Sequence, residues 1–220
     1  MPLAAFAEAL PIAIGTLMAA APLVSVPLIL VTRPDRRPHH AFVAGWIAGL
    51  AAVGAVAIVM SDLSTPRDAA PAPWIVWLRL ILGFVLIGFA ARKWLGRGKG
   101  GKAPAWMSSL DTMSPGTALG LGVALAALNP KNAVLAASGA LAIAAATPAP
   151  GAQAMAYAGF VLVASLGLIT PFVLTLALGA RASRPLTALK DRMTRHGDAI
   201  IAAVLLILGA IVAWNAFGDL

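Results

Sequence analysis

The sequence contains no cysteine and little charge, since Asp, Glu, Lys and Arg together make up 11% of its 220 residues. The absence of cysteine excludes a disulfide framework, a thiolate nucleophile and a cysteine metal site. Three histidines are too few for most metal cages, so we expect no metal or other cofactor. A soluble domain is about 25% charged. The low charge therefore excludes a soluble enzyme, a soluble nucleic-acid-binding domain and a disulfide-stapled secreted module.

Long hydrophobic runs are abundant, and hydrophobic residues make up 60% of the sequence. A run of about 20 apolar residues is long enough to cross a bilayer as a helix. Six such spans are expected, at residues 9–32, 41–61, 73–91, 116–146, 152–180 and 199–217. The sequence thus predicts an all-α polytopic membrane protein with a single transmembrane domain, residues 1–220, and not an enzyme.

Most basic residues lie in three of the five connections between these spans. The first, third and fifth connections hold 13 of the 16 Lys and Arg residues. Cytoplasmic loops carry an excess of Lys and Arg, so we expect these connections in the cytoplasm and both termini on the outer side of the cell (inner) membrane. Orientation accounts for the net charge of +8, and nucleic acid is not an expected partner. His39 and His40 are predicted to be solvated in the first connection, and Arg79 to extend toward the outer surface.

The fourth expected span is longer than a bilayer requires. As one helix its 31 residues would extend about 46 Å, at about 1.5 Å per residue. The hydrocarbon layer is about 30 Å thick. Two short spans forming a hairpin would move the basic fifth connection to the outside. A single crossing, broken or tilted, fits the charge pattern better.

The two halves of the chain resemble each other on either side of the basic loop 96–111. Residues 1–95 and 112–220 each hold three expected spans, and an odd number of spans per half inverts the second half relative to the first. Short segments match in order: 19–22 with 127–130, 41–46 with 155–160, and 85–88 with 206–209. The sequence therefore predicts two inverted three-helix repeats, the architecture of many secondary transporters.

Proline interrupts the first span of each half near its middle, where inverted-repeat transporters bind substrate. Pro22 lies in the first span, close to Ser25, and Pro130 lies in the fourth. Proline donates no backbone hydrogen bond and its ring clashes with the preceding turn. Both helices are therefore predicted to be broken at the midplane. The released backbone groups need partners in a bilayer, and Ser25, Asn129 and Asn132 are the side chains placed to supply them.

Lys131 is the one charged residue within the fourth span. It lies too deep to reach the surface fully, and a charge at that depth costs at least about 2.5 kcal/mol. No Asp or Glu lies in any other expected span. Lys131 is therefore either neutral and held by asparagine and carbonyl groups, or ready for an anionic ligand; a lysine that fills a water-lined crevice is the plain structural alternative. Thr170 and Pro171 in the fifth span are a second candidate kink facing this site.

Residues 110–122, LDTMSPGTALGLG, and 127–135, ALNPKNAVL, resemble the GAP family of actinobacterial membrane proteins. That family includes the peptidoglycolipid- and sulfolipid-addressing proteins and lies within the LysE superfamily of exporters. Residues 41–50, AFVAGWIAGL, resemble its second span, and the likeness extends over essentially the whole chain. Its specific part is the Asn-Pro-Lys-Asn motif at 129–132, which the resemblance implies is functional together with its counterpart around Pro22.

The resemblance implies a role in moving a cell-envelope glycolipid, or its precursor, across or out of the inner membrane. Within the superfamily, a thiol–disulfide electron carrier would need a membrane cysteine pair, and a divalent-cation exporter would need acids in its spans or a histidine-rich loop. An amino-acid exporter of the lysine type would place a cation against Lys131, so an anionic amphiphile suits the charge better. The expected partners are membrane lipids and this substrate, with a homodimer or a lipid export or synthesis complex as protein partners. The alternatives left open are a non-transporting membrane partner of such a complex and a small-solute exporter.

Overall fold

The computed structural model describes residues 2–19, 35–64, 73–96, 112–178 and 202–218. These residues are almost entirely helical, and no strand occurs among them, as the all-α prediction requires. In chain order the helices are α1 (Pro2–Ala19), α3 (Arg37–Ser64), α4 (Pro73–Leu95), α5 (Pro115–Val123), the π-helical turn η3 (Ala124–Leu128), α6 (Pro130–Ala146), α7 (Pro150–Leu178) and a C-terminal helix (Ala202–Gly218).

Three helices are long and apolar enough to cross a membrane: α3, α4 and the Pro150–Thr170 part of α7. The pair α5–η3 and α6 passes the same test as one broken span, with a bend of 65° between its two parts. Such a bend is found in a broken span or in a re-entrant loop, so the single broken crossing stays a prediction. α1 and the C-terminal helix are apolar but shorter. The chain is thus a helical membrane protein with three or four spans among the described residues.

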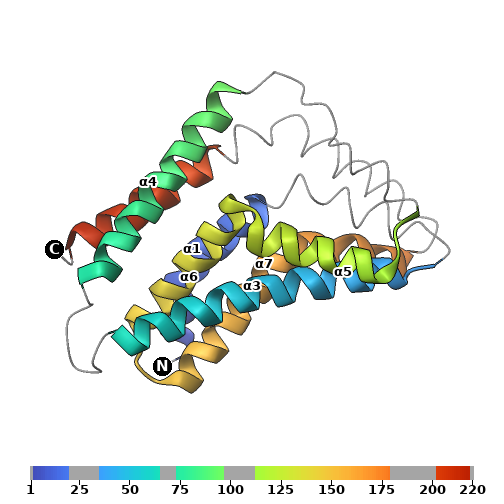
Figure 1. Cartoon of the computed structure of the whole chain (residues 1–220), viewed down its shortest axis with the longest axis horizontal. Coiled ribbons are helices and arrows are strands. Elements are labelled where there is room, and N and C mark those ends of the chain that lie inside the picture. The colour runs from blue at the N-terminus through green and yellow to red at the C-terminus, as the bar shows by residue number, and fades with distance from the viewer. Residues whose placement is uncertain (1, 20–34, 65–72, 97–111, 179–201, 219–220) are drawn as a thin grey trace.

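The helices of the bundle pack through small residues and a few large apolar ones. α1 packs against α6 and α7, while α3 packs against α5, η3 and α6 (Figure 1). A Cβ atom at Gly45 of α3 would overlap the carbonyl oxygen of Leu119, and one at Gly122 of α5 would overlap that of Phe42. Only glycine therefore permits this approach of α3 to α5, which is the small-residue packing typical of membrane helices.

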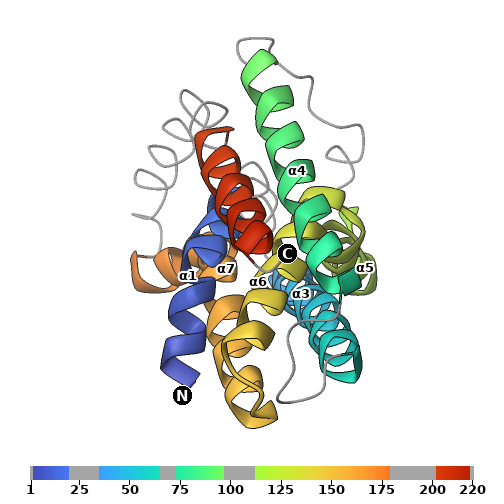
Figure 2. The same ribbon diagram turned by 90° about the vertical axis from the view of Figure 1, so that its left-hand side faces the viewer.

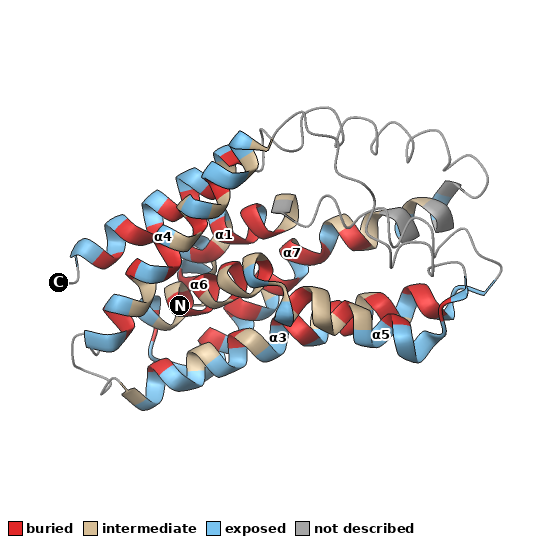
Figure 3. Ribbon diagram, turned by 45° about the horizontal axis from the view of Figure 1, so that its top comes forward, coloured by how far each residue is buried: buried red, intermediate tan, exposed pale blue. Residues whose placement is uncertain are grey.

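α4 and the C-terminal helix form a pair beside this bundle, as the turned view in Figure 2 also shows. A Cβ at Gly83 would lie 2.9 Å from the backbone oxygen of Gly209, so these helices also meet through glycines. Large apolar side chains of α4 remain exposed, including Trp77 and Phe84. Figure 3 shows the buried residues of the helices turned inward and the exposed ones outward. Exposed apolar faces suit helices whose surroundings are hydrocarbon chains.

The beginning of α3 differs from the prediction. The helix starts at Arg37, so the first-connection histidines lie in its first turn, and His39 is only 1% exposed. The prediction that His39 is solvated is therefore wrong, although His40 is exposed. The side chain of Asp35 accepts a hydrogen bond from the backbone N–H of Arg37 (3.0 Å), and proline is tolerated in a first turn. These two local signals extend the helix four residues upstream of the hydrophobic run.

Candidate functional site

The break predicted at Pro130 is present in the structure. The five-residue π-helical turn η3 ends at Leu128, Asn129 has an extended backbone (φ −74°, ψ 115°), and Pro130 begins α6. Proline suits the first position of a helix because no N–H is needed there. The direction of the helix changes by 65° across this one residue.

Two asparagine side chains satisfy backbone groups that the break releases. The backbone N–H of Asn129 donates to the carbonyl of Ala124 (3.1 Å), five residues back. In this π register the next donor in line for the carbonyl of Leu125 would be Pro130, which has no N–H. The side-chain amide of Asn132 donates to that carbonyl instead (2.8 Å). The side chain of Asn129 caps the new helix by accepting from the backbone N–H of Lys131 (3.2 Å).

This geometry predicts that Asn132 stabilises the break. In the Asn132→Leu variant the carbonyl of Leu125 loses its donor, and we expect a loss of about 1–3 kcal/mol of stability, the usual cost of an unsatisfied buried group. Unfolding of the purified protein in detergent measures this. Asn215→Leu, at an exposed asparagine, is the matched control and should stay within about 0.5 kcal/mol. Equal stability of the two variants would contradict the role given to Asn132.

Lys131 lies in the first turn of α6 and is half-buried. The positive end of the helix dipole lies at the same place. Lys93, in the last turn of α4, is close enough for its positive charge to repel that of Lys131. Asn132 is fully buried, and its side-chain oxygen has no hydrogen-bond partner among the described residues. The break thus brings together positive charge and an unused acceptor.

The structure does not join the other predicted site residues to this break. Thr170 donates its hydroxyl to the carbonyl of Leu166 in its own helix (2.6 Å). α7 continues as helix through Pro171. Pro22 and Ser25 lie outside the described residues, so the pairing of a first-span break with the break at Pro130 stays a prediction.

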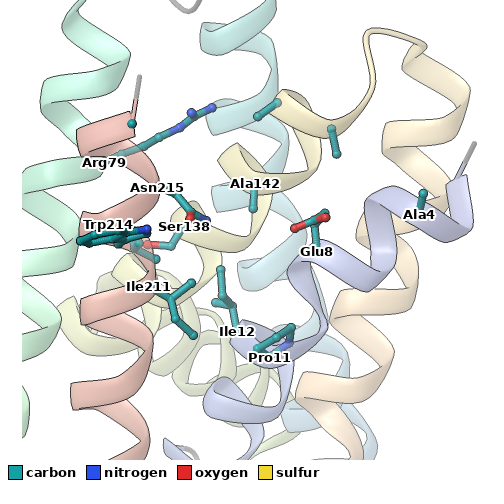
Figure 4. A pocket seen from close by; sticks show the side chains of 14 residues that line it. Ala4, Glu8, Pro11, Ile12, Arg79, Ser138, Ala142, Ile211, Trp214 and Asn215 are labelled. Carbon is teal, nitrogen blue, oxygen red and sulfur yellow. The ribbon is translucent and has the colours of Figure 1, made fainter. Parts of the chain in front are cut away.

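Arg79 does not extend to the outer surface as predicted. Its guanidinium donates to the carbonyl of Leu141 in α6 (3.2 Å) and is partly buried. It contributes to the wall of a cavity of about 610 Å³ between α1, α4, α6 and the C-terminal helix (Figure 4). The polar residues of this wall are Glu8, Arg79, Ser138 and Asn215. The sequence offered one signal for it, a lone arginine inside an apolar span.

A second cavity, of about 510 Å³, is an apolar groove between α3, α4 and α6. Val53 and Met60 of α3, Trp74 and Leu78 of α4, and Leu141 of α6 are among its lining residues. Leu141 therefore faces this groove while its carbonyl holds Arg79 of the polar cavity. Within the described ranges, no three His, Asp or Glu side chains come together as a metal-binding group.

Comparison with known proteins agrees with the resemblance carried by the Asn-Pro-Lys-Asn motif. No curated protein and no solved structure matches the chain. The family described as "Sap, sulfolipid-1-addressing protein" has a model that matches residues 12–218. The matched residues include the whole of the broken span, α5 to α6. They also include the helices that line the two cavities, apart from residues 2–11 of α1. The chain therefore belongs to the sulfolipid-1-addressing protein family.

Proposed function

We propose that this protein is an inner-membrane transporter that takes part in moving an anionic envelope glycolipid, or a similar amphiphile, to the cell surface. The observation that carries the proposal is Lys131, a basic side chain in the first helical turn after a break inside a membrane span. The family description, which names a sulfolipid, supports a lipid with a negatively charged head group.

The break has the chemistry of an anion-binding site. Helix N-termini bind phosphate and sulfate because their backbone N–H groups and dipole favour negative charge. At α6 this end carries the ammonium group of Lys131, with the charge of Lys93 acting on the same region. The unused oxygen of Asn132 is an acceptor for a hydroxyl group. An anionic head group that also carries hydroxyls fits both features.

An amphiphile also needs an apolar surface along its path. The groove between α3, α4 and α6 is lined by apolar residues. One of its walls is α6, the helix whose first turn holds Lys131. We assign this groove to the acyl chains of the transported lipid. Acyl chains can fill such an apolar groove, whereas a polar amino acid would gain little from it. The groove therefore favours a lipid over an amino acid as the substrate.

Helix packing supports an arrangement of two inverted repeats with six spans. α1 of the first half packs against α7 of the second, and α3 of the first packs against α5 of the second. α1 also contacts α6, and α3 contacts α7. The third helices of the two halves, α4 and the C-terminal helix, meet through Gly83 and Gly209. Each helix of one half thus packs against the other half in the exchange expected for a pseudo-twofold axis.

The proposed orientation is tested with single cysteines, because the native chain has none. Cysteines at Asp35, Thr112 and Ser183, in the first, third and fifth connections, should resist a membrane-impermeant thiol reagent in intact cells. Cysteines at Ala69 and Ala149, in the second and fourth, should be labelled, since the positive-inside rule places these outside. Labelling at Ser183 in intact cells would mean that the broken α5–α6 pair does not cross the membrane but returns to the side on which it began.

Transport itself is tested with the purified protein in lipid vesicles. A fluorescent sulfated glycolipid is placed in the inner leaflet, and an impermeant quencher reports its arrival in the outer leaflet under an applied ion gradient. We expect the protein to accelerate this arrival, and to do so less for the same lipid without sulfate. The alternative is a non-transporting partner in a larger lipid export or synthesis complex. This alternative would be established if the protein does not accelerate the arrival of the lipid, although its absence from cells removes the lipid from the surface.

A further inference from the structure

The polar cavity bounded by α1, α4, α6 and the C-terminal helix is separate from the break that holds Lys131. Its walls come from the N-terminal part of α1, the first half of α4, the last half of α6 and the end of the C-terminal helix. In the proposed orientation all four of these segments lie toward the outer side of the membrane. A substrate that leaves the break for the cell surface would therefore meet this cavity next.

The side chains of the cavity wall are unlike those expected beside lipid. Arg79 contributes a guanidinium, Glu8 a carboxylate and Asn215 an amide. The indole of Trp214, which is 79% exposed, lies next to Asn215 at the edge of the cavity (Figure 4). Arginine and glutamate are costly at a hydrocarbon surface. Amide, carboxylate and guanidinium groups bind hydroxyl groups, and an indole ring offers an apolar face on which a sugar ring can stack.

One polar group of this wall has unused hydrogen-bonding capacity. Ser138 is 3% exposed, and its hydroxyl has no partner among the described residues. A buried hydroxyl without a partner is costly, so a ligand or water group is expected to complete it. Glu8 lies on the wall that α1 forms, and Arg79 lies on the wall that α4 forms. In Figure 4 the two side chains stand on different walls, with Ala142 between them.

The same helix connects the break to the cavity. Lys131 is the second residue of α6 and Ser138 follows seven residues later, a rise of about 10 Å at 1.5 Å per residue. Leu141, one turn further, holds the guanidinium of Arg79 through its carbonyl. α6 thus carries a cationic group at its start and supports a second one near its outer end.

We propose that this cavity is an outward-facing receiving site for a sugar head group that carries an anionic substituent. Arg79 binds the anionic group; Ser138, Asn215 and Glu8 bind sugar hydroxyls; and Trp214 stacks against the ring. The carboxylate of Glu8 disfavours a bare anion such as sulfate, because like charges repel across so small a cavity. The inference deepens the proposed function, on which it rests, by naming the head group and a second site for it.

A cysteine at Ala142 reports on the charge and the occupancy of the cavity. Ala142 is half-buried and lines the cavity. Ala149→Cys, in the turn between α6 and α7, is the matched control outside it. In membranes of the full-length protein, the reaction rates of a sulfonate-bearing and an ammonium-bearing methanethiosulfonate are measured at each cysteine. The ratio of the two rates at Ala142→Cys, divided by the ratio at Ala149→Cys, cancels the reactivity of the reagents.

We expect this normalised ratio to favour the sulfonate reagent, and to fall about fivefold in Arg79→Gln, the effect of about 1 kcal/mol of charge interaction. Arg79→Lys, which keeps the charge, should retain most of the preference, and Glu8→Gln should increase it. Glucose 6-sulfate should slow the reaction at Ala142→Cys and leave Ala149→Cys unchanged, whereas glucose or inorganic sulfate alone should protect less.

Three results would overturn the proposal: a preference for the ammonium reagent, a ratio that Arg79→Gln leaves unchanged, or stronger protection by free lysine than by glucose 6-sulfate. The last would identify the cavity as a site for a zwitterion. These measurements use no transport assay. Loss of protection with normal lipid export would therefore remove the receiving site alone, while protection without any lipid export would remove the proposed function alone.

Discussion

Export of the anionic lipid should fall by about ten- to a hundredfold in the Lys131→Met variant. A hydrogen bond to a charged group is worth about 1.5–3 kcal/mol, and each 1.4 kcal/mol corresponds to about a factor of ten. Methionine has a similar length but no charge, and a charge within a membrane span costs at least about 2.5 kcal/mol. The variant should therefore insert at least as well as the native chain. The surface lipid profile of cells, normalised to membrane abundance of the protein, measures the effect.

The Lys131→Arg variant separates charge from titration. Arginine is always protonated, so it should retain part of the export if the charge binds an anion, and little if the lysine must lose a proton. Arg92→Met is the matched control, because it removes an exposed cation from the last turn of α4 and should leave export unchanged. Full export by Lys131→Met at equal abundance would eliminate Lys131 as a site residue.

The second large effect is expected at the break itself. In Pro130→Ala the backbone N–H is restored and the ring is removed, and alanine is favoured over proline within a helix by about 3 kcal/mol. Such a difference changes a two-state population by about a hundredfold, so α5 and α6 should join into a straighter helix. The helix end beside Lys131 would then be lost. Export should fall at least tenfold, which corresponds to a loss of about 1.4 kcal/mol or more in binding free energy.

Straightening is measured separately from export. Spin labels at the exposed positions Leu119 and Ala145, on α5 and α6, should lie farther apart in Pro130→Ala than in the native chain. Pro150→Ala is the matched control, because Pro150 is the first residue of α7, where proline costs little. A straightened helix with normal export would show that the break is only a packing kink.

The repeat hypothesis adds a condition on Pro22. If the two breaks frame one site, Pro22→Ala should impair export as Pro130→Ala does while leaving insertion intact. Normal export by Pro22→Ala, with loss in Pro130→Ala, would leave the site at the fourth span alone and contradict the pseudo-symmetric arrangement.

Local chemistry explains what could be predicted at the break. Proline lacks an N–H wherever it stands, so the interruption at Pro130 follows from the sequence, as does its pairing with polar neighbours. The sequence did not indicate which carbonyl would need a partner. The π register of η3 decided that the amide of Asn132 reaches Leu125, and a helical register depends on packing along the whole segment.

The sequence by itself determined the membrane class, the family, and the position of the break and of Lys131, because these depend on composition, a short motif and the covalent properties of single residues. Only the tertiary structure decided that His39 is buried, that Arg79 turns inward to Leu141, and that Glu8, Arg79, Ser138 and Asn215 surround one cavity. These residues come from four helices far apart in the chain. Their meeting depends on how glycine-lined faces let helices approach, which no local pattern specifies.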